Sequence, residues 1–61
     1  MIDKETLAHK MYDTYCASVG GKAFNGDPLP LAVEFFADET KQKQANAWRD
    51  TAQVAIDLFT N

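Results

Sequence analysis

The chain has one cysteine, Cys16, and one histidine, His9, among its 61 residues. A lone cysteine cannot form a disulfide within the chain, and two strong nitrogen or sulfur ligands are too few for a structural zinc site. A domain this short buries only about 60% of the surface that its unfolded chain exposes. We therefore expect a single domain over residues 1–61 that gains further stability by self-association, as a homo-oligomer.

Apolar residues in the first third of the chain recur every three or four positions, which is typical of one face of a helix. Asp3 is a suitable N-cap, and Ile2 and Leu7 have the spacing of a hydrophobic staple. The pair Gly20-Gly21 should end this helix, because glycine adopts the left-handed conformation of a C-terminal cap. The apolar positions are Leu7, Ala8, Met11, Tyr12, Tyr15, Cys16 and Val19.

Residues 22–30 should form a loop between helices. Asn25-Gly26 is a strong turn signal, and Pro28 and Pro30 prevent a continuous helix. Two apolar residues, Phe24 and Leu29, lie within this polar segment. We expect both to pack onto the helical core and to keep the loop ordered.

Two further helices are expected after the loop, a short one over 31–37 and a long one over about 39–59. Asp38 is the candidate N-cap of the long helix. The adjacent Phe35 and Phe36 give the short helix more apolar surface than one face buries, so we expect one of them to face a partner subunit. Val54 and Leu58 form a second apolar strip on the long helix, beside its main stripe. The main stripe is Ala45, Trp48, Ala52, Ala55, Ile56 and Phe59.

Together these elements predict an all-α fold. Long N- and C-terminal helices pack antiparallel, with an ordered Gly/Pro loop and a short middle helix between them. The formal net charge is -3 and the six Lys and Arg residues are scattered, so duplex nucleic acid is not expected as a partner. The apolar runs are too short to span a membrane. One unpaired cysteine and no N-terminal export signal favour the cytosol.

The sequence carries no catalytic motif that we recognise. It has no Gly-x-Ser-x-Gly, P-loop or His-Glu-x-x-His pattern. His9 and Cys16 lie on or beside the apolar helix face, where packing residues are expected, and a chain this small rarely encloses a cavity that shifts the pKa of a carboxylate. We therefore expect a protein that is not an enzyme and that has no cofactor and no metal.

The glycine-bearing loop and the aromatic residues are the candidate binding site. Lys22 and Asn25 lie among glycines whose backbone amides can approach an anion, although this loop follows a helix C-terminus rather than preceding an N-terminus. Aromatic rings can stack on a nucleobase, and an arginine can bind phosphate. The alternative is that the aromatics form the core and the glycines only cap and turn. The candidate ligand-binding residues are Tyr12, Tyr15, Lys22, Phe24, Asn25, Trp48 and Arg49.

Three segments resemble a group of small proteins encoded by tailed phages and prophages. They are Tyr12-x-x-Tyr15-Cys16, the segment Val-Gly-Gly-Lys-Ala-Phe-Asn-Gly-Asp-Pro-Leu-Pro over 19–30, and Ala47-Trp48-Arg49. The order of helix, glycine turn, proline loop and helix is also loosely similar to ryanodine-receptor-type repeats, although Leu-Ala-Val stands at 31–33 where those repeats have a tryptophan. The phage resemblance implies an accessory role against host defence, in the cytosol of the host cell.

Our hypothesis from the sequence is a non-enzymatic phage accessory protein. It would sequester a small anionic, nucleotide-like ligand at the interfaces of a homo-oligomer. The alternative is an inhibitor that binds a host defence protein through its acidic face or through Phe35 and Phe36. A third interpretation is a minor structural protein of the phage.

Overall fold

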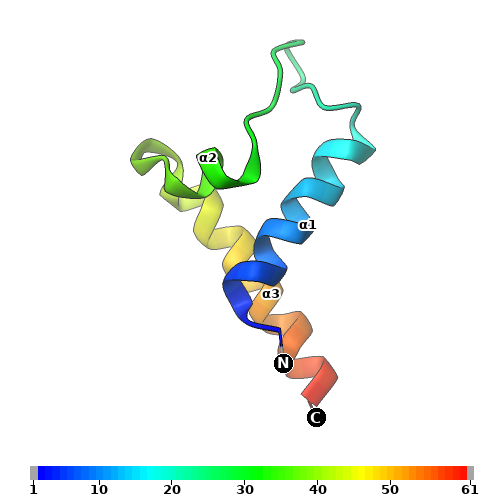
Figure 1. The fold of residues 1–61 in the computed structure, drawn as a ribbon, viewed down its shortest axis with the longest axis vertical. Helices are drawn as coiled ribbons and strands as arrows, with labels where there is room; N and C mark the ends of the chain where they lie inside the picture. Colours follow the sequence, from blue (N-terminus) through cyan, green and yellow to red (C-terminus); the bar gives the residue numbers. More distant parts are fainter. Residues whose placement is uncertain (1, 61) are drawn as a thin grey trace.

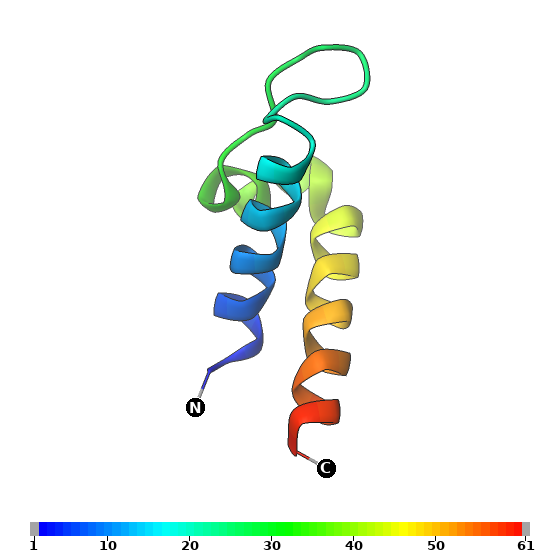
Figure 2. The same cartoon turned by 90° about the vertical axis from the view of Figure 1, so that its right-hand side faces the viewer.

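The computed structural model describes residues 2–60, and these form an all-α fold (Figure 1). The helices are α1 (Lys4–Ser18), α2 (Ala32–Ala37) and α3 (Gln42–Thr60), and a single 3-10 turn, η1 (Glu39–Lys41), precedes α3. The long helices α1 and α3 pack against each other and run in opposite directions, so the two ends of the chain lie at the same end of the molecule (Figures 1 and 2). The predicted fold class and helix arrangement are confirmed.

Helix α1 begins and ends at the predicted residues. Asp3 accepts a hydrogen bond from the backbone N–H of Thr6 at 2.7 Å, as an N-cap does. After Ser18 the chain turns through Gly20 and Gly21, which have φ angles of 77° and 76°. The Gly21 N–H donates to the Cys16 carbonyl at 2.7 Å. Side chains other than glycine rarely adopt these angles, which explains why the helix stops here.

Tyr12 lies at the centre of the core. Its side chain is 3% exposed and stacks on Phe35 of α2, with ring centroids 4.4 Å apart. The rings of Phe36 and of Trp48 on α3 meet it edge-on at 5.8 Å. The Tyr12 hydroxyl donates to the carbonyl oxygen of Pro30 at 2.9 Å, so one side chain joins α1, the loop, α2 and α3.

Alanines let the two long helices approach closely. Ala8 on α1 and Ala45 and Ala52 on α3 are all 0% exposed. A methyl group leaves little space between two helix backbones, so close packing rather than large side chains fills this part of the interior.

The expectation that Phe35 or Phe36 faces a partner subunit is wrong. Their side chains are only 8% and 5% exposed, because α2 lies in the angle between α1 and α3 and packs on both (Figure 1). Contact on two sides buries a wider arc of α2 than one neighbour would. The exposed apolar residues of this segment are instead Leu31 and Val33.

The start of the long helix also differs from the prediction. Asp38 does act as a cap, but its carboxylate accepts from the Thr40 N–H, at 2.9 Å, and so caps the turn η1. Helix α3 itself begins at Gln42, whose side-chain amide donates to the carbonyls of Phe36 and Asp38 at 3.0 and 2.9 Å. These two hydrogen bonds attach the first turn of α3 to the end of α2.

The loop is ordered by its own hydrogen bonds and not by contact with the core. The Ala23 N–H donates to Asp27 O at 2.7 Å, and the Gly26 N–H donates to Ala23 O at 2.9 Å. Because these bonds close the loop on itself, it projects beyond the end of α1 (Figure 2). Phe24 is therefore fully exposed, and the prediction that it packs on the core is wrong, whereas Leu29 is partly buried.

Removing the hydroxyl of Tyr12 tests its place at the centre of the fold. Tyr12→Phe should lower the free energy of unfolding by about 1 kcal/mol, because the carbonyl of Pro30 loses its donor. Tyr15→Phe is the matched control, since the Tyr15 hydroxyl has no hydrogen-bond partner among residues 2–60. Urea denaturation followed by circular dichroism measures both variants. Equal losses in the two would contradict this role for Tyr12.

Candidate functional site

Tyr15 of α1 and Trp48 of α3 form an aromatic pair at the surface. Their ring centroids are 5.4 Å apart and the rings are inclined by 54°. Tyr15 is exposed and Trp48 is partly buried against the core. Shallow hollows border this pair on several sides, and we call the pair with these hollows the aromatic surface.

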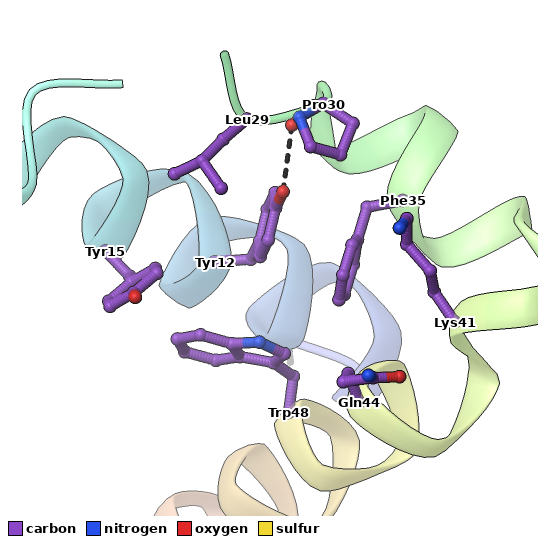
Figure 3. Close-up of a pocket in the computed structure, with 8 residues that line it drawn as sticks. All are labelled: Tyr12, Tyr15, Leu29, Pro30, Phe35, Lys41, Gln44 and Trp48. Atoms are coloured by element: carbon purple, nitrogen blue, oxygen red, sulfur yellow. Dashed lines mark hydrogen bonds between the residues drawn. The ribbon is translucent and has the colours of Figure 1, made fainter. Parts of the chain in front are cut away.

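The first hollow lies between the pair and the end of the loop (Figure 3). It measures about 290 Å³ and reaches the core rings of Tyr12 and Phe35. Lys41 and Gln44, from the turn before α3 and from its first turn, lie on one side. Because its floor is aromatic and one rim carries an ammonium and an amide, this hollow can contact both a ring and an anion.

Two further hollows border the same pair. One, of about 380 Å³, lies along α1 and touches both Tyr15 and Trp48; the other, of about 360 Å³, lies between Tyr15 and the loop. The hollow along α1 is lined by the pair and by Lys10, Met11, Thr14 and Ser18. The hollow beside the loop is lined by Tyr15 and by Val19, Lys22, Ala23 and Phe24.

Positive charge is concentrated around the aromatic surface although the chain as a whole is acidic. Each of the three hollows has one lysine in its lining, namely Lys41, Lys10 and Lys22, and none has an Asp or a Glu. Among residues 2–60, no ion pair involves these three lysines. The formal net charge is -3, so the surface differs in sign from the average of the molecule.

Free hydrogen-bonding groups accompany these charges. Within the described part of the chain, the indole N–H of Trp48 and the hydroxyl of Tyr15 have no hydrogen-bond partner. Both groups are accessible to water, so they can donate to a ligand. The hydroxyl of Tyr12 differs, because it already donates to Pro30. Burial raises the pKa of Tyr12 well above its usual range, so this hydroxyl stays protonated. The aromatic surface therefore offers flat rings, ammonium groups and unused donors.

Arg49 has a different place from the one expected of a ligand-binding residue. Its Nε and Nη2 donate to the carboxylate of Glu5 at 2.8 and 3.0 Å, which joins α3 to α1. Its Nη1 donates to Asn46 and Gln42, and the guanidinium lies 5.2 Å from the centroid of the Phe36 ring. The hydrogen bonds from Arg49 hold the pKa of Glu5 below its ordinary value. Arg49 lines none of the three hollows.

The structure thus brings together five of the seven candidate residues and separates two. Tyr12, Tyr15 and Trp48 meet at the first hollow, and Lys22 and Phe24 border the adjoining one. Arg49 lies elsewhere, as described. Asn25 is in the loop turn, where its side chain bonds to the side chain and backbone of Asp27 at 3.1 Å each.

Sequence reasoning missed several polar residues of the aromatic surface, among them Lys10, Lys41 and Gln44. A usable signal existed for two of them. Lys41 precedes Trp48 by seven residues and Gln44 precedes it by four, which are helical spacings that place side chains on one face. Lys10 is brought to Trp48 by the packing of α1 on α3, which no local spacing reveals.

The remaining chemistry-bearing residues are dispersed. Among residues 2–60 no group of three His, Cys, Asp or Glu residues is placed to hold a metal ion. His9 lies 3.2 Å from a carboxylate oxygen of Glu5, with its ring 4.2 Å from that of Phe36. Cys16 is a partly buried free thiol. None of the helices in the described range is long and apolar enough to cross a membrane.

No protein-family model, no curated protein and no solved structure matches this chain. The resemblance to small phage proteins therefore stays a prediction.

Acid should remove the stability that the ion pair of Glu5 with Arg49 contributes. The folded pKa of Glu5 is lowered from its ordinary value of 4.5, so its contribution is full above that pH and is lost as the pH falls through the lowered value. Glu5→Gln should cost up to about 1 kcal/mol at pH 7, because the pair is exposed and screened, and almost nothing at pH 2. Thermal melts at both pH values measure this difference.

Glu34→Gln is the control for this experiment, because Glu34 is exposed and makes no ion pair among residues 2–60. It should melt like the parent chain at both pH values. A loss in Glu5→Gln that is equally large at pH 2 would contradict the assignment, since the carboxylate would then act without its charge.

Proposed function

We propose that this chain is a non-enzymatic binding protein that sequesters a small anionic ligand with a planar ring, such as a nucleotide, at the aromatic surface. One observation carries the proposal. The exposed pair of Tyr15 and Trp48 is bordered by three lysines and by no carboxylate, in a chain whose net charge is -3. Two other hollows of the described residues contain neither an acid nor a lysine, so the three lysines distinguish the aromatic surface.

The energetics of such a site follow from its two components. Stacking of a nucleobase on an aromatic side chain contributes about 1–3 kcal/mol and tolerates different bases. A lysine ammonium is a compact point charge that binds phosphate without a fixed geometry. Lys10, Lys22 and Lys41 lie on different sides of the pair, so a ring stacked on it has an ammonium within reach in several directions.

The shape of the hollows supports sequestration by an oligomer over binding by one subunit. Binding pockets for small molecules usually measure about 300–1,000 Å³ and cover most of the ligand. The hollows here measure about 290, 360 and 380 Å³ and are shallow. A second subunit packed beside them would enclose the ligand, as expected for a site at the interfaces of a homo-oligomer.

The lining supports binding over catalysis. General acid–base catalysis needs a group that titrates near neutral pH within reach of the substrate. The linings of the three hollows contain no histidine, no cysteine and no carboxylate; their titratable groups are lysines and tyrosines. With the phage resemblance, this favours a counter-defence protein that withdraws a nucleotide signal in the host cytosol.

The alternative is an inhibitor that binds a host defence protein through its acidic face or through an apolar surface, and the apolar surface differs from the one predicted. Phe35 and Phe36 are buried and cannot contact a partner. Phe24, Leu31 and Val33 are exposed apolar residues in or near the loop, and they would form the apolar contact in that case. The third interpretation, a minor structural protein of a phage, stays a prediction without a specific observation in its favour.

Titration with a panel of linear and cyclic nucleotides tests the proposal, with Trp48 fluorescence and native mass spectrometry as readouts. Nucleotide binding should quench the indole and add one fixed mass. Lys10→Gln combined with Lys41→Gln should weaken binding about tenfold or more and flatten its salt dependence, because two ammonium groups are lost. Tyr15→Leu should weaken it by removing one stacking face.

Lys43→Gln is the matched control for charge, because Lys43 is an exposed lysine on α3 that lines none of the three hollows. It should leave the dissociation constant nearly unchanged. If Lys43→Gln weakens binding as much as the changes at Lys10 and Lys41, attraction is non-specific and the proposal fails. It also fails if no nucleotide in the panel binds.

A further inference from the structure

One side of α3 carries a largely apolar strip whose residues are all exposed in this subunit. Its residues recur at intervals of four, three and four, which is the heptad spacing of a helix seam that packs on another helix. Val54 and Leu58 are 58% and 74% exposed, and the two smaller members are exposed as well. The strip consists of Ala47, Thr51, Val54 and Leu58, and we call it the α3 strip.

The α3 strip adjoins the aromatic surface. At 100° per residue, Trp48 and Ala55 border it on one side, and Asp50 and Asp57 border it on the other. Ala47 and Thr51 line, with Trp48, a further hollow of about 160 Å³. The strip thus lies between Trp48 of the aromatic surface and the two aspartates. An apolar centre with polar residues at its edge is typical of the core and rim of an interface.

The accessible area of the subunit matches what a dimer would cover. The chain exposes 4678 Å² for a mass of 6.8 kDa. A monomeric protein of this mass exposes about 4,000 Å², so this subunit has an excess of about 700 Å². A stable interface of standard size buries about 800 Å² on each partner. The excess is of the size of one side of one interface, and the exposed α3 strip and the projecting loop with Phe24 both contribute to it.

The end of α3 is only partly covered within its own subunit. Of residues 53–60, none is buried, although they form the last two turns of the helix. Helical segments with few tertiary contacts are marginal in water, so packing from a second copy would stabilise this end. A second copy presents the same exposed strip, and a twofold axis would set apolar residues against apolar residues.

We propose that a second copy of this chain packs on the α3 strip and forms a twofold dimer through α3. The inference deepens the proposed function and, for the ligand, rests on it. Because the strip adjoins Trp48, the boundary between the copies lies beside the aromatic surface, and a ligand stacked there contacts both subunits. The second subunit would then cover the side of the ligand that the shallow hollows leave open.

A second apolar surface near the end of α3 could also form a dimer interface, and it can be distinguished from the α3 strip by mutation. An apolar groove of about 400 Å³ runs between the start of α1 and the end of α3, and Ile2, Leu7 and Phe59 are among its lining residues. Phe59 and Leu58 are adjacent in sequence and both largely exposed, but only Leu58 belongs to the α3 strip. The two neighbours thus report on different faces of one helix.

Sedimentation velocity over a range of protein concentrations, without any nucleotide, is the decisive experiment. The parent chain should be a dimer at micromolar concentrations. Leu58→Gln and Val54→Gln should each raise the dimer dissociation constant about tenfold or more, since each removes two interface contacts by symmetry. Phe59→Gln should leave it nearly unchanged. At protein concentrations high enough to keep all three variants dimeric, circular dichroism should show equal helix content, because the substituted positions are exposed and glutamine is a good helix former.

A monomer at every concentration would overturn the proposal, as would dissociation by Phe59→Gln in place of Leu58→Gln, which would move the interface to the groove. Since no nucleotide is present, these outcomes do not depend on ligand binding. A dimer that dissociates as expected but binds no nucleotide would leave the α3 interface standing and reject only the proposed function.

Discussion

The stacking of Tyr12 on Phe35 is the contact on which the rest of the structure depends. Tyr12 reaches every other part of the fold, since its ring also meets Phe36 and Trp48 and its hydroxyl holds the carbonyl of Pro30. Few other large side chains are buried, and the remaining buried residues are alanines. A domain of this size has little apolar material to spare, so one well-placed tyrosine joins elements that a larger core would hold by many contacts.

The charges of the chain divide into those that the fold uses and those that it leaves free. Asp3 and Asp38 cap helical turns, which lowers the pKa of each through hydrogen bonds with Thr6 and Thr40. Glu5 binds Arg49. The lysines around Tyr15 and Trp48 have no such structural partners among residues 2–60. An acidic chain can therefore present a locally positive surface, because several of its acids are committed elsewhere.

Local features of this fold could be predicted from the sequence, and non-local ones could not. The cap at Asp3, the stop at Gly20-Gly21 and the helix types follow from residues close together in the chain. Arg49 pairs with Glu5, which is 44 residues away in the chain. Because no local pattern reveals such a distant partner, the sequence-based prediction treats Arg49 as a free cation. The exposure of Phe24 was missed for the same reason, since hydrophobicity alone does not show that the loop closes on itself before reaching the helices.

The alanines between α1 and α3 have an effect beyond packing. Ala8, Ala45 and Ala52 are fully buried in the two helices that pack together, and Tyr15 and Trp48 lie on these same two helices. The separation of the two rings is thus set by methyl groups that no ligand touches. A larger side chain at any of the three positions acts as a wedge, and it would alter which ring systems the surface accepts while leaving every residue of that surface in place.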